Sequence, residues 1–233
     1  MADFKLLKWY VQNINLRLFI KLNYFSKNII REDGHFIRPY KNAIVNIDKT
    51  AKIYIKGKHI DIGINKLKGS KAETYLRMGK NAIWNSNNGC SLYYNADLEI
   101  KDNAVFTSGF FTANSGSTII CTTKITIGDN VMMGRNNLIY DSDFHSILSR
   151  TGKVTNYNRE VTIEDNVWIT TNVTVLKGVT IGSGSVISSN STVTTAIPNE
   201  AIAGGESTAR VKHIGVKWSR KYPGRREIKN ANK

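Results

Sequence analysis

Residues 161–193 read VTIEDNVWITTNVTVLKGVTIGSGSVISSNSTV, and this stretch decides the fold. Two tracks of side chains run through it, and the members of each track are six residues apart. The first track is aliphatic throughout: Ile163, Ile169, Val175, Ile181, Ile187 and Val193. The second begins two residues earlier and turns from aliphatic to small: Val161, Val167, Val173, Val179, Ser185 and Ser191. Neither an α-helix, with about 3.6 residues per turn, nor an ordinary strand, with a period of two, produces this spacing.

The period of six predicts a solenoid. Each hexapeptide forms a short strand and a turn, three of them close one triangular coil of about 18 residues, and stacked coils bury the aliphatic tracks. The Gly, Asn, Asp, Ser and Thr residues between the tracks suit tight turns. The same period recurs earlier in the chain, at Ile47 and Ile53, at Ile100 and Phe106, and at Ile127, Met133 and Ile139. We therefore expect a mainly β protein, with a parallel β-helix over residues 42–206.

Two segments interrupt the repeat and are predicted to be loops. Residues 63–77 are basic, contain several glycines and are out of phase with the repeat, and residues 140–160 separate Ile139 from Val161. A solenoid gains no stability by extruding such a loop. We therefore expect functional residues in these segments.

The two ends of the chain differ from the repeat. In residues 1–41, apolar side chains recur at spacings of three and four from Phe4 to Ile29, which predicts an N-terminal amphipathic helical segment. This segment either packs on the protein or a neighbouring subunit, or lies as a basic amphipathic helix on an anionic membrane. The sequence leaves both alternatives open. Residues 207–233 are predicted to form a basic C-terminal segment.

The net charge narrows the choice of partners. The 233 residues include 33 Lys and Arg and 18 Asp and Glu, a formal charge of +15. Residues 1–41 hold eight basic and three acidic side chains, and residues 207–233 hold nine and one, which leaves +2 for residues 42–206. Nucleic-acid binding would predict basic residues interleaved with aromatic ones along the body, and the body is nearly neutral, so we expect no nucleic acid partner. The charge is expected to serve an anionic cofactor, an acidic glycan or a membrane surface.

The sequence also indicates a compartment. Cys90 and Cys121 are too few for a disulfide scaffold, which fits a reducing environment. No stretch approaches the roughly 18 uninterrupted apolar residues that a membrane span requires, and no cleavage pattern of small residues follows the N-terminus. We expect a cytoplasmic protein, with membrane association through the N-terminal segment as an open alternative.

Four stretches resemble a known family: ITIGDN at 125–130, VTIEDNVWI at 161–169, VLKGVTIGSGSVI at 175–187 and IPNEAIAGG at 197–205. They are similar to the hexapeptide-repeat acyltransferases. The branch that they resemble is the sugar O-acetyltransferases, which include maltose and galactoside acetyltransferases and enzymes that decorate surface polysaccharides. The resemblance covers residues 98–212 and, more loosely, 43–97. It implies a left-handed parallel β-helix, a homotrimer, and acetyl-CoA bound in the cleft between neighbouring subunits.

The resemblance also implies catalytic residues. The family places a histidine in the loop that leaves the repeat, and DSDFHSI at 141–147 matches this motif with His145. An alcohol is a poor nucleophile toward a thioester, and a base that accepts its proton as the bond forms contributes about 10²–10⁴-fold. His145 is therefore the predicted general base, and Asn114 the amide that holds the acceptor or the developing oxyanion. An ordinary loop histidine and a turn asparagine are the alternatives.

A carboxylate or carbonyl beside His145 would fix its tautomer. Asp143 is the predicted catalytic partner, and the other candidates within reach of the loop are Asp141, Glu160 and Glu164. A turn-capping role is the alternative for each of them.

For acetyl-CoA, the resemblance places Trp168 against the pantetheine arm, and Thr171 and Ser189 where the pantetheine amides are bonded. Lys177, Arg210 and Lys212 are predicted to meet the CoA phosphates, where a cationic fork or point charge suits a dianion.

The chain departs from the family pattern at three positions. Thr195 replaces the lysine before the IP dipeptide, Thr170 replaces the glycine after VWI, and Ser207 replaces the proline of GxPA. These departures move phosphate binding toward Lys177, Arg210, Lys212 and the basic segment, and they leave the detailed pose of the cofactor open.

Sugar O-acetylation, as part of surface polysaccharide assembly, is the predicted function. Two alternatives stay open: the acceptor is an amino sugar, a serine or an antibiotic alcohol, or the protein is a non-catalytic β-helical scaffold. We expect no metal, since His35, His59 and His213 lack the pattern of the β-helical carbonic anhydrases. A covalent mechanism through Cys90 or Cys121 is disfavoured because both lie in phase with the repeat.

Overall fold

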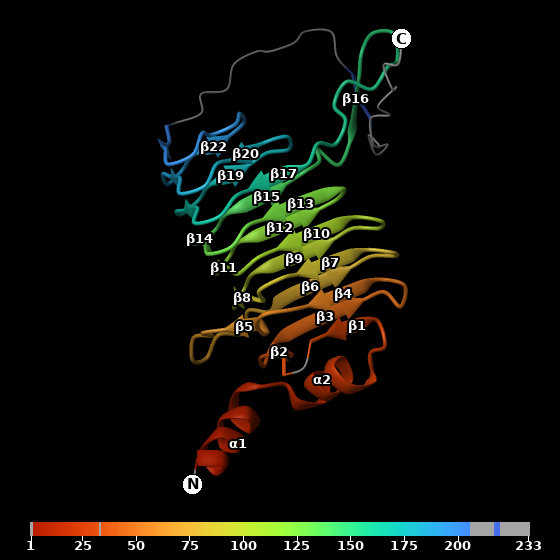
Figure 1. Cartoon of the computed structure of the whole chain (residues 1–233). Helices are drawn as coiled ribbons and strands as arrows, with labels where there is room; N and C mark the ends of the chain where they lie inside the picture. Colours follow the sequence, from red (N-terminus) through yellow and green to blue (C-terminus); the bar gives the residue numbers. More distant parts are fainter. Residues whose placement is uncertain (1, 33, 206–216, 220–233) are drawn as a thin grey trace.

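The computed structural model describes residues 2–32, 34–205 and 217–219. Three parallel sheets enclose a single core and run along the molecule, with successive strands of the chain placed in different sheets (Figure 1). The first sheet contains β1 (Ile29–Arg31), β4 (Lys52–Ile55), β7 (Ile83–Ser86), β10 (Val105–Ser108), β13 (Lys124–Ile127), β17 (Val161–Ile163) and β20 (Thr180–Ile181). The second contains β2 (Ile37–Pro39), β5 (Ile60–Ile64), β8 (Cys90–Tyr93), β11 (Phe111–Ala113), β14 (Val131–Met133), β18 (Trp168–Ile169), β21 (Val186–Ile187) and β23 (Ile202–Ala203). The third contains β3 (Ala43–Ile47), β6 (Thr74–Met78), β9 (Asp97–Ile100), β12 (Thr118–Cys121), β15 (Leu138–Tyr140), β19 (Thr174–Val175) and β22 (Thr192–Val193). The predicted mainly β, parallel β-helix architecture is confirmed.

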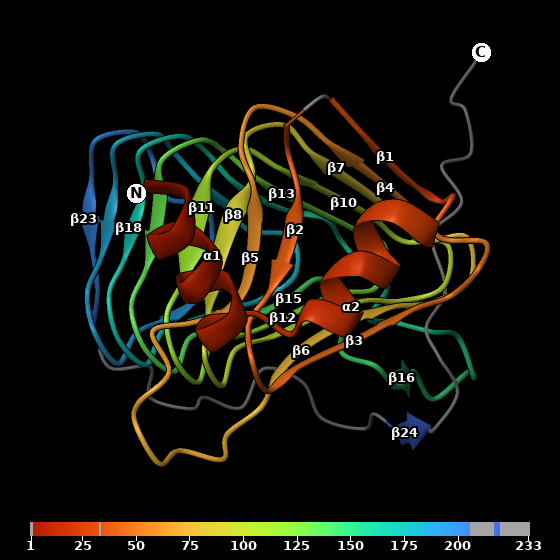
Figure 2. The ribbon, with the colours of Figure 1, turned by 90° about the horizontal axis from the view of Figure 1, so that it is seen from below.

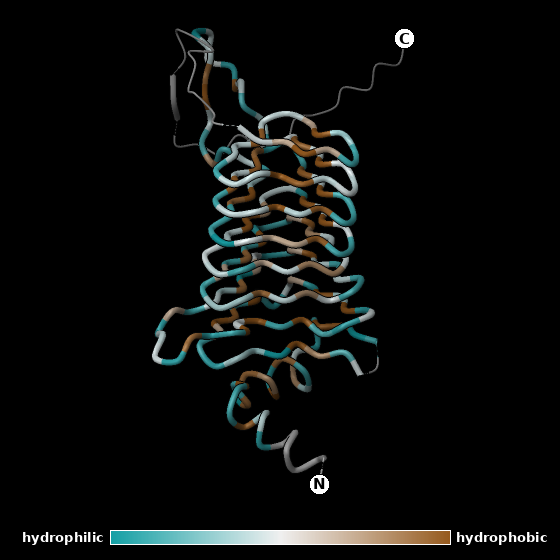
Figure 3. Tube along the Cα trace, turned by 90° about the vertical axis from the view of Figure 1, so that its left-hand side faces the viewer, coloured by the Kyte–Doolittle hydropathy of each residue, from teal (hydrophilic) through white to brown (hydrophobic). Residues whose placement is uncertain are grey.

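The two six-residue tracks line the interior. Every member of both tracks is 5% exposed or less. Ile163 pairs in register with Ile181, 18 residues later, and Ile169 pairs in the same way with Ile187. Each aliphatic side chain therefore stacks on its counterpart in the next coil, and the trace in Figure 3 alternates between hydrophobic and hydrophilic residues along each coil.

Asparagine makes many of the corners. Twelve described residues other than glycine have a positive φ, and ten of them are asparagines. Asparagine tolerates this left-handed conformation because its short side chain hydrogen-bonds locally. Corner asparagines also bond between coils, from Asn130 Nδ2 to Asn166 Oδ1 at 2.9 Å and from Asn172 Nδ2 to Asn190 Oδ1 at 3.1 Å. These corners account for ten of the 25 asparagines in the chain.

The coils in the middle of the chain are larger than the regular ones. Trp84 pairs in register with Phe106, which is 22 residues away rather than 18. The Trp84 and Phe106 rings pack edge to face at 5.7 Å, and Phe111 adds a third ring at 6.0 Å from Phe106. The indole N–H of Trp84 donates to Ser108 Oγ at 3.1 Å, so this buried polar atom is satisfied. Aromatic side chains thus fill coils that aliphatic ones would leave open.

The N-terminal segment is not one continuous amphipathic helix, as the periodicity predicted. It consists of α1 (Ala2–Asn13), α2 (Leu16–Ile20) and a π-helical turn (Lys21–Phe25). The break occurs because Ile14 pairs with Tyr40 and because the Asn15 side chain accepts a hydrogen bond from the Leu18 N–H, which caps α2. β1 and β2 also lie within residues 1–41, so the coils begin before residue 42. The two helices cover this end of the β-helix (Figure 2).

Both predicted loops are present, with different bounds. The first spans 65–73, because β5 extends to Ile64 and β6 begins at Thr74. The second leaves β15 after Tyr140 and returns at β17, and it contains its own strand, β16 (Ser146–Leu148). β16 pairs antiparallel with β24 (Lys217–Ser219), so part of the basic segment 207–233 is a strand that the sequence pattern did not predict. The loop projects away from the stacked coils in Figure 1.

Candidate active site

The root of the 141–160 loop is fixed by a buried carboxylate. Asp141 is fully buried and accepts hydrogen bonds from the backbone N–H groups of Thr122, Thr123 and Lys124 at 2.6–2.7 Å. Burial raises the pKa of Asp141, and the three N–H donors oppose that rise. With both oxygens taken up in this way, Asp141 ties the loop to the preceding coil.

His145 follows a turn whose backbone is under strain. Phe144 has φ +61°, in a region that bulky side chains rarely occupy. The His145 N–H donates to the carbonyl of Asp143 at 2.6 Å, the Phe144 N–H donates to Ser142 Oγ at 2.9 Å, and the Phe144 ring packs on Tyr140 at 5.7 Å. Such strain persists only where the surroundings enforce it, and it concentrates at functional sites. His145 is half-buried in this turn.

Asn156, which the sequence analysis did not single out, holds the two sides of the loop together. Its Nδ2 donates to His145 O and to Asp143 Oδ2, both at 2.8 Å, and its Oδ1 accepts from the Ile147 N–H at 2.6 Å. Asparagine suits this position because one side chain offers two donors and an acceptor. No sequence signal separates Asn156 from the many corner asparagines of this chain.

Lys177 lies under the same turn. Its ammonium donates to Asp143 Oδ2 at 2.5 Å and to the carbonyl of Asn156 at 3.0 Å. The Lys177 side chain is 12% exposed and that of Asp143 is 40% exposed. The structure thus brings together Asp143 and Lys177, which were predicted for different roles, in one network with the backbone of His145.

The two remaining carboxylate candidates have partners of their own. Glu160 forms an exposed ion pair with Lys124 at 2.7 Å. Glu164 Oε2 accepts from the N–H and the hydroxyl of Ser183, at 2.9 and 3.0 Å, between adjacent coils. Asp143, by contrast, shares a hydrogen-bond network with the backbone of His145.

The predicted amide and pantetheine residues lie at another corner, between the second and third sheets. Asn114 follows β11, Thr171 follows β18 and Ser189 follows β21, so all three occupy this corner at different coils. Asn114 Oδ1 accepts from the Ser115 N–H at 2.8 Å. Ser189 Oγ bonds Thr170 Oγ1 at 3.1 Å, so the threonine that replaces the family glycine is part of this corner.

A buried asparagine holds this corner in shape. Asn137 is fully buried, and its Nδ2 donates to the carbonyls of Gly134 and Thr170 while its Oδ1 accepts from the Val173 N–H. A Cβ at Gly134 would lie 2.3 Å from the Thr170 carbonyl oxygen, so only glycine permits this approach of the two coils. Asn137 was not predicted as a functional residue, and the structure gives it a structural role.

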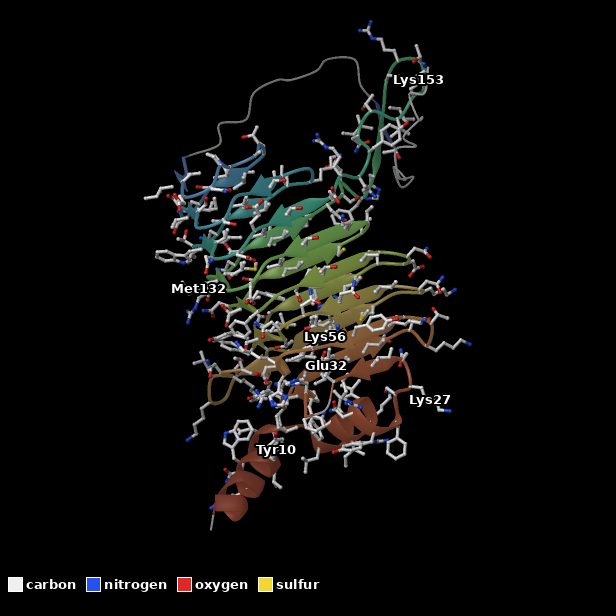
Figure 4. All side chains as sticks on the ribbon, viewed as in Figure 1. Tyr10, Lys27, Glu32, Lys56, Met132 and Lys153 are labelled. Carbon is white, nitrogen blue, oxygen red and sulfur yellow. The ribbon has the colours of Figure 1, made fainter. Side chains whose placement is uncertain are left out.

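Trp168 is on the outer surface of the second sheet and is 45% exposed. Trp168 pairs in register with Met132 on one neighbouring strand and with Val186 on the other. Val186 pairs in turn with Ile202 on the next strand. Met132 is 50% exposed and Ile202 is 81% exposed, and Figure 4 labels Met132 on this side of the molecule. The predicted pantetheine-contacting tryptophan is therefore part of an exposed apolar column that runs along the last coils.

Within one chain, Asn114 and His145 lie at opposite ends of the strands of the third sheet. Asn114 comes before the strand β12, level with the corner at Asn136, whereas His145 comes after β15. The four residue steps from Asn137 to Asp141 cross the sheet, a distance of about 13 Å. A reacting atom must lie within about 3 Å of its catalytic groups, so the placement of Asn114 and His145 at opposite ends of these strands favours a site that two chains share.

The other predicted residues are outside the site or outside the described part of the chain. Arg210, Lys212, Ser207 and His213 lie among residues that the structure does not describe. Cys90 and Cys121 are buried in the core, and burial raises the pKa of Cys90 well above its usual value. Within residues 2–32, 34–205 and 217–219, no group of three or more His, Cys, Asp or Glu side chains could hold a metal ion.

Comparison with known proteins identifies the repeat. Residues 160–195 match the family described as bacterial transferase hexapeptide (six repeats). This match, with the parallel strands that the structure forms there, identifies residues 160–195 as hexapeptide repeats. The match covers the part of the chain in which the coils are regular.

Solved structures with a similar fold include two acetyltransferases and an N-acyltransferase. NeuO, an acetyltransferase specific for polysialic acid, is 20% identical, aligns over 88% of this chain and 92% of its own, and has a TM-score of 0.46. A hexapeptide-repeat acetyltransferase of Vibrio cholerae O1 biovar eltor in complex with acetyl-CoA is 27% identical over 55% and 66%, with a TM-score of 0.42. The N-acyltransferase AntD of Bacillus cereus, with coenzyme A and dTDP-4-amino-4,6-dideoxyglucose, is 12% identical over 93% of both chains, with a TM-score of 0.45. No curated protein matches the sequence significantly.

Proposed function

We propose that this protein is an acyltransferase that moves an acetyl group from acetyl-CoA to a hydroxyl of a sugar or glycan, with His145 as the general base. The observation that carries the proposal is the turn at residues 142–145. A loop extruded from a regular solenoid holds a half-buried histidine behind a strained phenylalanine. That strain has no structural benefit in a repeat whose other left-handed corners use asparagine, glycine and one glutamate.

The chemistry follows from the residues. The acceptor hydroxyl attacks the carbonyl carbon of the thioester while the His145 imidazole accepts the hydroxyl proton. The C–S bond then breaks, the ester leaves, and the proton passes from the imidazolium to the thiolate, so free CoA is the second product. The amide N–H groups of Asn114 suit the oxyanion of the tetrahedral intermediate, because they donate without titrating.

The site requires two subunits. In one chain, Asn114 precedes β12 and His145 follows β15, so the length of a strand, about 13 Å, separates the ends of the third sheet from which they come. We infer that His145 of one protomer meets Asn114 of its neighbour. A homotrimer closes such head-to-tail contacts into a ring. The exposed column with Met132, Trp168 and Ile202 supports this arrangement, because a partner or a bound pantetheine arm would cover it.

We assign the cofactor residues accordingly. Trp168, Thr171 and Ser189 line the pantetheine arm, and Arg210 and Lys212 meet the phosphates. Lys177 acts differently from the sequence-based prediction. Its ammonium is paired with Asp143 and the Asn156 carbonyl, so we assign it to positioning the His145 turn.

A pair of histidine variants tests the proposal. His145→Ala should reduce CoA release from acetyl-CoA by at least about 100-fold with a panel of nucleotide sugars, lipid-linked oligosaccharides and polysaccharides. His35→Ala, at a half-buried histidine near the N-terminal end, serves as the matched control and should keep wild-type turnover. Undiminished turnover in His145→Ala would contradict the assignment of the base. The acceptor that supports turnover in the wild type distinguishes a sugar hydroxyl from the amine, serine and antibiotic alternatives.

A further inference from the structure

The N-terminal end of the β-helix carries an unusual concentration of exposed apolar side chains. Twelve large hydrophobic residues are exposed in the described part of the chain, and seven of them lie between residues 9 and 30. These seven are Trp9, Val11, Leu16, Ile20, Tyr24, Phe25 and Ile30. We call the surface made by residues 8–30 the end face. It lies at the bottom of Figure 1, below the first coil.

The apolar residues of the end face follow one side of a helix. Leu16, Ile20 and Tyr24 are four residues apart along α2 and the π-helical turn, so they share a side, and they are 39%, 47% and 67% exposed. The opposite side carries Leu18 and Leu22, which pack on the core. The helix is therefore apolar on both sides, although only one side has a partner in the described structure.

Cations surround this stripe. Residues 4–31 contain six basic side chains and no acidic one. Lys8, Arg17, Lys21 and Lys27 are exposed, and Arg17 and Lys21 follow Leu16 and Ile20 directly. The 65–73 loop extends the basic surface, because Lys66 and Lys68 line one cavity together with Trp9. An apolar centre with a cationic rim is the pattern of helices that lie in a membrane interface.

We propose that the end face binds an anionic membrane surface, with Leu16, Ile20, Tyr24 and Phe25 in the headgroup region and the surrounding cations on acidic lipids. A second copy of this chain fits less well, because two such faces would bring like charges together. The binding would be peripheral, since no described helix is long and apolar enough to cross a bilayer. The proposal does not depend on the acetyl transfer proposed above.

Membrane binding through this face would orient the β-helix upright on the bilayer. Four strand spacings, about 19 Å, separate β3 from β15 in the third sheet, and the His145 turn follows β15. Lys153, in the 141–160 loop, and Tyr10, in α1, are at opposite ends of the molecule in Figure 4. The loop would then lie on the side away from the lipid.

Co-sedimentation with vesicles tests the proposal. The full-length protein should bind phosphatidylcholine vesicles that contain phosphatidylglycerol, and bind pure phosphatidylcholine at least tenfold more weakly. Each cation near an anionic surface contributes about fivefold, so Arg17→Gln/Lys21→Gln should weaken partitioning about 25-fold. Ile20→Ser/Tyr24→Ser should weaken it at least tenfold by removing the apolar contact. Arg150→Gln/Lys153→Gln, with the same charge change at the far end, should bind like the wild type.

Several outcomes would overturn the proposal. The first is equal binding of the wild type to neutral and anionic vesicles. The second is that Arg150→Gln/Lys153→Gln weakens vesicle binding as much as Arg17→Gln/Lys21→Gln does. Light scattering that shows end-to-end association, abolished by Ile20→Ser/Tyr24→Ser without vesicle binding in the wild type, would assign the face to a second copy instead. The salt dependence of wild-type binding needs no variant: binding should fall steeply as salt rises, because the charges act at an exposed surface.

Discussion

The sequence and the structure predict different roles for Lys177. As a phosphate ligand it would act on the affinity for acetyl-CoA. As the partner of Asp143 and of the Asn156 carbonyl it would act on the order of the His145 turn. Replacing it in Lys177→Met keeps most of the apolar stem and removes only the ammonium.

The size of the effect follows from the contacts that are lost. A hydrogen bond to a charged group contributes about 1.5–3 kcal/mol. The Asp143 side chain is 40% exposed, so solvent screens the pair, and we take the lower bound of about 1.5 kcal/mol. This corresponds to an equilibrium constant for ordering the turn that is about tenfold smaller. We therefore expect kcat to fall by up to about tenfold, with the KM for acetyl-CoA changed less than about twofold.

Steady-state kinetics of a double-mutant cycle measures this. Asp143→Asn should reproduce the loss in kcat, and Lys177→Met/Asp143→Asn should be no worse than either single variant, because the two residues act as one unit. The reasoning is refuted if Lys177→Met raises the KM for acetyl-CoA tenfold at unchanged kcat, or if the two effects simply add.

Three further predictions concern stability and loop order. Ile163→Ala should lower the free energy of unfolding by about 2–5 kcal/mol in urea denaturation, whereas Thr162→Ala, its outward-facing neighbour, should change it by less than about 0.5 kcal/mol. Deleting residues 217–233 removes the strand paired with β16, so hydrogen exchange at Ser146 and Leu148 should accelerate, because the Ile147 N–H between them donates to Asn156 instead; unchanged protection would contradict that pairing. Burial, with Arg38, lowers the pKa of His59 below 6.5, so the unfolded state takes up its proton first. Thermal stability should therefore fall as pH drops through 6.5 and below, and His59→Asn should flatten this dependence.

The fold could be predicted from the sequence because the core of a solenoid repeats. The members of the two tracks from Val161 to Val193 meet the same environment every six positions, and the structure buries all of them. The six-residue period is less regular in the middle of the chain, where Trp84 and Phe106 fill larger coils. These two residues are paired but lie 22 positions apart in the sequence. The N-terminal segment is helical, as predicted, but periodicity does not encode a local break such as the one between Ile14 and Asn15.

The site could be predicted only in part. His145 is in a loop that interrupts a regular pattern, and such a loop is visible in sequence. Asn156 and Lys177 hold that loop through contacts that depend on how it folds back. No sequence signal singles out Asn156, and the sequence pointed to Lys177 for phosphate binding and not for this role. The pairing of β16 with β24 joins segments about seventy residues apart through backbone bonds, for which side-chain patterns carry no information.

The central claim is that each active site takes His145 from one subunit and Asn114 from its neighbour. The direct test is to unfold and refold an equal mixture of His145→Ala and Asn114→Ala proteins, each inactive alone, and to measure CoA release. In randomly assembled trimers, about a quarter of the sites would combine an intact His145 with an intact Asn114, so about a quarter of wild-type activity should return. A mixture that stays as inactive as its components would contradict the account.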